Sequence, residues 1–216
     1  MSDDDPDTAV PTSEGPWELP GDLDATARKI VTAARIRFSE NGFSETTMED
    51  IAAQAGVGVA TVYRRFRHRR RLVRYAIIDE AIRLANTLSA AGASATGPEE
   101  LIVETFTAFV REASQPKLLT RSLRDAGESS ELSAFLTDAT IVRLGRTTIA
   151  ASLRPWQQAG RLPADLDIEV VGEIISRLMN SLIEAPGGSV IPIGDAAEAR
   201  RFATTYLVGL LTATAR

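Results

Sequence analysis

The chain has 216 residues, of which 44% are hydrophobic, and it carries a formal net charge of −5 at pH 7. It has no cysteine and a single histidine, His68, which excludes a disulfide framework, a histidine or thiolate zinc site and a Ser-His-Asp triad. No apolar run reaches membrane-spanning length, and the N-terminus is acidic where a signal peptide is basic. We therefore expect a soluble cytoplasmic protein without a cofactor.

Charge is divided unevenly along the chain. Residues 25–75 hold 11 basic and 4 acidic side chains, whereas the rest of the chain holds 13 basic and 25 acidic ones. Residues 1–23 are polar, acidic and contain proline and glycine, which is typical of a disordered tail. Because the local field steers a polyanion to a surface, the basic segment predicts nucleic acid as a partner.

Three short helices are predicted in the basic segment. The first begins at Asp24 and ends at Gly42, which tolerates the left-handed conformation of a helix C-cap. The second begins at a capping box formed by Thr47 and Asp50, and Gly56 then turns the chain into a third helix that ends in arginines. Two helices joined by such a turn form a helix-turn-helix, which places its second helix in the DNA major groove.

The remainder of the chain is also predicted to be helical, with Pro155 expected to kink or break one helix. The expected helices cover residues 69–91, 98–113, 117–124, 130–159, 167–184 and 195–212. Strand-like alternation is restricted to residues 189–193, where proline interrupts it. We predict an all-α protein of about nine helices, organised as an acidic tail (1–23), a helix-turn-helix domain (24–68) and a helical bundle (69–216).

The basic segment contains a series of short motifs made of aromatic, hydroxyl and small residues. They are Phe38 with Asn41-Gly42-Phe43, Thr46-Thr47 with Ile51-Ala52, Ala55-Gly56-Val57, Thr61 with Tyr63 and Phe66, and Leu72. This pattern resembles the N-terminal DNA-binding domain of the tetracycline-repressor (TetR) family of bacterial transcription regulators. The resemblance implies three DNA-binding helices, a fourth that links them to a ligand-binding bundle, and two final helices that dimerise. Members are typically repressors released from their operators by a small molecule.

The third helix is expected to read DNA. Its small first residues allow close approach to base edges and thymine methyl groups, while hydroxyls and arginines suit phosphate oxygens. The start of the second helix offers backbone amides to an anion. The predicted DNA-binding residues are Thr46, Thr47, Met48, Gly58, Val59, Ala60, Thr61, Tyr63, Arg64, Arg65 and Arg69.

Two departures from the family pattern bear on this surface. Members often carry serine and a basic residue where this chain has Gly58 and Val59, so two polar contacts are missing. His68 stands in place of a serine cap and is followed by arginines, which the dipole at a helix start disfavours. We interpret the second change as a trade of local stability for attraction to DNA.

Apolar residues of the bundle are expected to line a cavity for a small hydrophobic ligand, because the resemblance implies a pocket there. They are Phe106, Phe109, Leu119, Leu136, Trp156, Ile175 and Met179. Apolar stripes at helical spacing usually form core, so a regulator with a solid core, governed by a protein partner or constitutively, stays an alternative. A helical enzyme is disfavoured by the missing cysteine and the lone His68, and a scaffold module leaves the arginines unexplained.

A homodimer on a palindromic operator is also expected. One short recognition helix covers few base pairs, and two related by symmetry reach successive major grooves about 34–36 Å apart. The stripes assigned to the interface are Val171, Ile174, Ile175, Leu178 and Leu182 on one helix and Phe202, Tyr206, Gly209 and Leu210 on the next. The sequence thus predicts a dimeric repressor released from its operator by a small, hydrophobic ligand.

Overall fold

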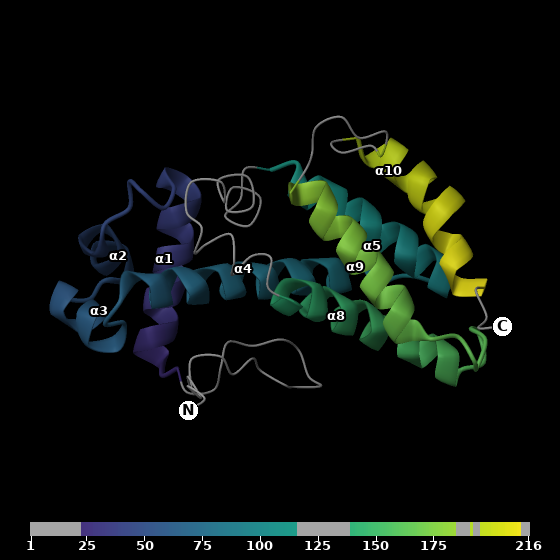
Figure 1. Ribbon diagram of the computed structural model, residues 1–216, viewed down its shortest axis with the longest axis horizontal. Coiled ribbons are helices and arrows are strands. Elements are labelled where there is room, and N and C mark those ends of the chain that lie inside the picture. Colours follow the sequence, from purple (N-terminus) through teal and green to yellow (C-terminus); the bar gives the residue numbers. More distant parts are fainter. Residues whose placement is uncertain (1–22, 116–138, 185–190, 192–194, 213–216) are drawn as a thin grey trace, which may run out of the picture.

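The structure is a computed structural model, and it describes residues 23–115, 139–184, 191 and 195–212 (Figure 1). Within these ranges the chain forms eight α-helices and no strand, which confirms the all-α prediction. The expected acidic tail, the helix at 117–124, the beginning of the helix at 130–159 and nearly all of the strand-like segment at 189–193 lie outside the described residues.

The first three helices form what we call the head (residues 23–68). They are α1 (Ala25–Asn41), α2 (Met48–Ala55) and α3 (Val59–Arg65). The Asp24 carboxylate caps α1 by accepting from the amide of Ala27 at 2.8 Å. Thr47 and Asp50 form the predicted reciprocal capping box at the start of α2. Gly56 ends α2 at a φ of 63°, in the left-handed region that favours glycine.

The head closes over a small apolar core. The side chains of Ile30, Phe38, Ile51, Val62 and Phe66 are at most 1% exposed. They come from all three helices and from the residue that ends α3, so the helix-turn-helix is held by its own packing.

The body comprises the described residues from 69 onward, and α4 (Arg69–Gly92) joins it to the head. Figure 1 shows α4 extending from the head, where α1 crosses it, into the middle of the body. The other long helices are α5 (Pro98–Ala113), α8 (Ala139–Gln158) and α9 (Ile168–Glu184). Helix α4 packs against α5 and α8, and α8 packs closely along α9. None of the described helices has the length and apolar character needed to cross a membrane.

Two glycines allow the close approach of α8 and α9. A β-carbon built on Gly172 of α9 would lie 2.6 Å from the carbonyl oxygen of Arg146. One built on Gly145 of α8 would lie 2.3 Å from the hydroxyl of Ser176. Each helix therefore presents a position without a side chain to a polar group of the other.

The C-terminal third departs from prediction in two details. Helix α8 includes Pro155 and continues to Gln158, so the proline, which stands in the last turn, does not end the helix at the residue before it. The final helix begins as α10 (Ala196–Phe202), continues as a π-helical turn (Ala203–Leu207) and ends as a 3-10 segment (Val208–Thr212). It packs against α5.

Candidate nucleic-acid interface and ligand cavity

The exposed side of α3 and the turn before it form the tip of the head. Gly58 and Ala60 are exposed, and a β-carbon at Gly58 would meet nothing within 4 Å. Tyr63 is 48% exposed although it is a large aromatic residue. Val59 and Thr61 are half-buried at the edge of this surface. The start of α3 is thus free of bulky side chains, and a flat aromatic ring with a hydroxyl stands beside it.

Two arginines project from the end of this helix. Arg64 and Arg67 are exposed, and no acidic group among the described residues pairs with either of them. Arg67 is absent from the sequence-based set of DNA contacts, although Arg65 and Arg69 on either side of it are included. Its position in the arginine run is the signal that would have included it.

Two residues of the predicted set point into the protein. The Thr46 side chain is buried, and its hydroxyl donates to the carbonyl oxygens of Arg37 at 3.1 Å and Gly42 at 2.8 Å. Met48 is 5% exposed and belongs to the core of the head. The structure corrects the prediction for these two side chains. The Met48 thioether is in the core and the Thr46 hydroxyl is bonded within the head, so neither side chain is exposed to DNA. Thr47, between them, is exposed.

Two predicted arginines serve the head itself. The Arg65 guanidinium pairs with the carboxylate of Asp24, which ties α3 to the start of α1. Arg69 donates to the backbone carbonyls of Phe43 and Thr46, and its guanidinium lies 5.2 Å from the centre of the Phe38 ring. Burial lowers the pKa of Arg69. Arg69 therefore points inward and connects α4 to the α1–α2 loop by hydrogen bonds, whereas the sequence predicted that it would contact DNA.

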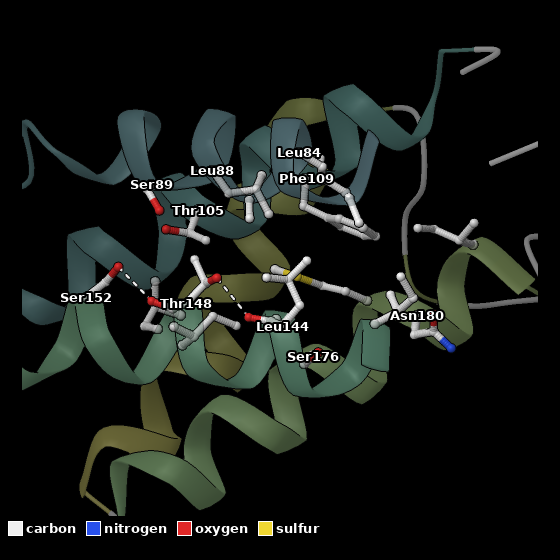
Figure 2. Close-up of a pocket in the computed structure, with 18 of the residues that line it drawn as sticks. Leu84, Leu88, Ser89, Thr105, Phe109, Leu144, Thr148, Ser152, Ser176 and Asn180 are labelled. Carbon is white, nitrogen blue, oxygen red and sulfur yellow. Dashed lines mark hydrogen bonds between the residues drawn. The ribbon is translucent and has the colours of Figure 1, made fainter. Parts of the chain in front are cut away.

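A cavity of about 70 Å³ lies in the body between α4, α5, α8 and α9. Its wall is mainly apolar, with hydroxyl groups spaced along it. The apolar part includes Leu84, Leu88, Phe109, Leu144 and Met179. Figure 2 shows Ser89, Thr105 and Ser152 toward one end of the cavity and Phe109 above its middle.

The hydroxyls differ in whether their protons are already engaged. Thr148 donates to the carbonyl of Leu144 at 2.8 Å and Ser152 donates to that of Thr148 at 3.0 Å, the two dashed lines of Figure 2. These hydroxyls still accept a hydrogen bond. The hydroxyls of Ser89 and Thr105 lie toward the same end of the cavity in Figure 2, and neither engages a group among the described residues. One end of the cavity thus offers both donors and acceptors.

The seven residues expected at a ligand site are divided by the structure. Phe109 and Met179 line the cavity. Phe106 and Ile175 are fully buried elsewhere in the core, and half-buried Trp156 stacks with the guanidinium of Arg161, so these three are corrections to the prediction. Leu119 and Leu136 lie outside the described residues.

Sequence reasoning also missed the contribution of α4 and the hydroxyl residues to this wall. Leu84 and Leu88 of α4 line the cavity, although neither is among the residues expected at a ligand site. Serine and threonine placed on the inner faces of several long helices, as at Thr105 and Thr148, are the available signal.

Comparison with known proteins bears on the whole chain. Residues 30–76 match the model of "Bacterial regulatory proteins, tetR family". No curated protein sequence matches the chain. Among solved structures, Salmonella enterica GusR is similar over 89% of this chain and 98% of its own, with 23% identity and a TM-score of 0.61.

Two ligand-bound structures have the same fold. RolR in complex with resorcinol is 14% identical, with a TM-score of 0.59 over 86% of this chain and 87% of its own. The transcriptional regulator FadR from Bacillus subtilis, in complex with stearoyl-CoA, is 16% identical, with a TM-score of 0.55 over 88% of this chain and 99% of its own.

The head, the linking helix and the helical body together have the fold of these similar structures, a helix-turn-helix head joined to a helical bundle. The likeness to the TetR family thus consists of a sequence match at residues 30–76 and a shared fold over most of the chain.

Proposed function

We propose that this protein is a homodimeric repressor that leaves a palindromic operator when a small molecule occupies the cavity. The observation that carries the proposal is the double use of α4. Its first turn is fastened to the head through Arg69, and its second half supplies Leu84, Leu88 and Ser89 to the cavity wall. A ligand that displaces α4 would therefore move the head, so DNA and ligand would favour different conformations.

The proposed DNA contacts are those predicted residues that reach the surface, together with Arg67. Gly58, Val59 and Ala60 would approach base edges, because nothing bulky stands in front of them. The remaining contacts would be to phosphates, which set register. They are Thr47, Thr61, Tyr63, Arg64 and Arg67, with Arg65 sharing its charge with Asp24.

A second copy of the chain would cover the outer faces of α9 and the final helix. Val170 and Ile174, one turn apart on α9, are 51% and 44% exposed, and Tyr206 is 66% exposed. Val171, Ile175 and Leu182, assigned to the interface from sequence, are buried within the subunit. The proposed interface therefore runs along Val170 and Ile174 rather than along the whole predicted stripe. Apolar side chains this exposed commonly mark such contacts.

The ligand would be small and mostly apolar, with at least one hydrogen-bonding group. The described lining consists of aliphatic, aromatic, hydroxyl and amide side chains. An apolar body would rest against Leu88, Phe109 and Leu144, and a hydroxyl or carbonyl would meet Ser89 and Thr105. We place the protein in the cytoplasm, with a helix-turn-helix domain (24–68) and a helical bundle (69–216) as its domains.

A regulator without a small-molecule ligand is the second candidate, and the size of the cavity favours it. A volume of about 70 Å³ holds on the order of five waters. If the cavity holds only water, DNA binding would be constitutive or controlled by a protein partner.

A fluorescence-anisotropy assay with DNA flanking the gene decides between the two. The full-length protein is titrated with labelled duplex in the presence of phenols, medium-chain alcohols and fatty acids. Release by one class, weakened by Leu88→Trp in the cavity wall but not by Asn86→Trp at an exposed position of the same helix, would support ligand control. Operator binding that no compound alters would favour the second candidate, and absence of binding to any duplex would overturn both.

A further inference from the structure

A partly buried ion-pair network crosses the junction between the head and the body. Its centre is Glu80 of α4, which is only 2% exposed. Arg35 comes to it from α1, and Arg83 comes from the next turn of α4. Arg83 also reaches Glu112 of α5, and Arg35 also reaches Asp79 of α4. Five charged groups thus connect three helices in one chain of contacts.

The carboxylate of Glu80 is shared between its two partners. Its Oε2 accepts from Arg35 at 3.2 Å and from Nε of Arg83 at 3.0 Å, while its Oε1 accepts from Arg83 at 2.9 Å. The same Arg83 nitrogen that reaches Oε1 donates to Glu112 at 3.3 Å, and Nε of Arg35 donates to Asp79 at 2.9 Å. A change at either arginine therefore alters the bonding of the other through one oxygen.

Arg83 stays charged and bonded to Glu80 at the centre of the network. Hydrogen bonding to Glu80 raises the pKa of Arg83, which stays charged. Burial raises the pKa of Asp79 at the edge of the network, against the opposing effect of Arg35. Asp79 accepts a hydrogen bond from Arg35, whereas Glu80 accepts from both Arg35 and Arg83 and is the carboxylate that the two arginines share.

Stability is a poor explanation for this arrangement. Desolvation of buried charges offsets much of their attraction, and well-packed apolar residues often serve a core equally well. The best-attested use of such a network is to select one relative arrangement of the packed elements. In this chain the selected arrangement is that of α1 and α5 about α4.

The network also adjoins the cavity. Glu80 directly precedes Ala81 of the cavity wall, and Arg83 directly precedes Leu84. Glu112 follows Phe109 by three residues, so it lies one helical turn beyond the cavity on α5. A molecule that parts α4 from α5 would stretch the contact between Arg83 and Glu112 first.

We propose that Glu80 is a positioning residue that couples the spacing of α4 and α5 to the orientation of the head on DNA. When α5 lies close to α4, Arg83 divides its hydrogen bonds between Glu112 and Glu80, and Glu80 also accepts from Arg35. When α5 moves away, Arg83 loses Glu112 and bonds to Glu80 alone. The bond between Glu80 and Arg35 is then weakened, and α1 is less firmly attached to α4. The ligand part of this inference rests on the proposed function, whereas the link between DNA and α5 does not.

The test measures that link without a ligand. A duplex is selected from random sequences with the full-length protein, and hydrogen exchange of the α5 amides is compared with and without it. In the wild type, DNA should change the protection of residues 98–113. Glu80→Gln, which keeps the shape but removes the charge, should bind the duplex while its α5 amides no longer respond. Glu104→Gln, which removes an ion pair to Arg200 in the body, is the matched control and should respond like the wild type.

A second measurement adds the neutral fluorophore N-phenyl-1-naphthylamine as a cavity probe. It should lower DNA affinity at least about fivefold in the wild type and less than about twofold in Glu80→Gln. A wild type that binds DNA but ignores the probe would count against ligand release, and the exchange experiment would still decide the role of Glu80.

Two results would overturn the inference. One is an α5 that ignores DNA in the wild type, and the other is a Glu80→Gln protein whose α5 responds fully. If Glu80→Gln does not fold, Glu112→Gln replaces it, because this change cuts only the α5 end of the network. That variant should keep DNA binding and lose the α5 response, and an unchanged response would overturn the inference equally.

Discussion

The tip of the head and the junction between head and body use arginine in opposite ways. At the tip, Arg64 and Arg67 are exposed and pair with no described acidic group. At the junction, Arg69 donates to two backbone carbonyls of the head, while Arg35 of the head and Arg83 of the body share the buried carboxylate of Glu80. The comparison teaches that arginines close in the sequence, such as Arg67 and Arg69, can differ in whether they face solvent or bond within the protein.

The largest effect is expected in the core of the head. Phe38→Ala removes a ring that is fully buried and that also supports Phe43 and the guanidinium of Arg69. We expect the free energy of unfolding to fall by about 3–5 kcal/mol. Urea denaturation followed by circular dichroism measures it. Tyr63→Phe, at an exposed ring, is the control and should stay within about 0.5 kcal/mol, and an equal loss in both variants would show that the head has no independent core.

Within the body, we expect the largest loss of stability where α8 packs against α9. Gly172→Ala places a methyl group 2.6 Å from a backbone oxygen that cannot turn away. We expect a loss of about 1–3 kcal/mol from overpacking, against the gain that alanine usually brings to a helix. The same denaturation assay applies, with Gly209→Ala as the control because nothing lies within 4 Å of its β-carbon. A stabilised Gly172→Ala protein would contradict the close helix contact.

The division of labour among the head arginines can be tested directly. Arg69→Ala leaves two carbonyls of the α1–α2 loop without their donor, so we expect a stability loss of about 1–3 kcal/mol. Arg64→Ala should leave stability within about 0.5 kcal/mol, weaken DNA binding and lower the salt slope of log K by about 0.9. Thermal unfolding and anisotropy titrations over a range of salt separate the two effects. The reverse outcome would mean that Arg69 leaves the loop to bind DNA.

Sequence predicts the head almost to the residue and the body only in outline. Gly42, Gly56 and the pair Thr47–Asp50 act on their immediate neighbours, so local rules place the helix ends. The inward turn of Arg69 depends on carbonyls 23 and 26 residues away, which no periodicity indicates. The cavity draws on four helices, and its polar end exists only because α4 and α5 bring Ser89 and Thr105 together. Contacts between distant segments are the part that local patterns leave out.

Substitutions at the polar end of the cavity test ligand binding in the body without disturbing the fold. The double variant Ser89→Ala, Thr105→Val removes two hydroxyls that no described residue engages. We expect affinity for a phenolic compound that releases DNA to fall by about 1–3 kcal/mol in total, as for two lost hydrogen bonds, with little change in unfolding. Isothermal titration measures it. The Thr147→Val variant, on α8 outside the cavity, should bind as the wild type does, and equal losses in both would point to a general effect on the body rather than to the two hydroxyls.

The smallest effect concerns the start of α4, where head and body meet. His68 makes no side-chain capping bond, and the first turn carries basic residues without an acidic one. Arg70→Glu replaces a cation that the helix dipole disfavours with an anion that it favours, so stability should rise by about 0.3–1 kcal/mol. The same change places negative charge beside the DNA face and should weaken operator binding. Arg70→Gln is the matched control and should give about half of each effect if charge is the cause. An operator affinity that stays the same in Arg70→Glu would show that the arginine run trades no stability for attraction to DNA at this position.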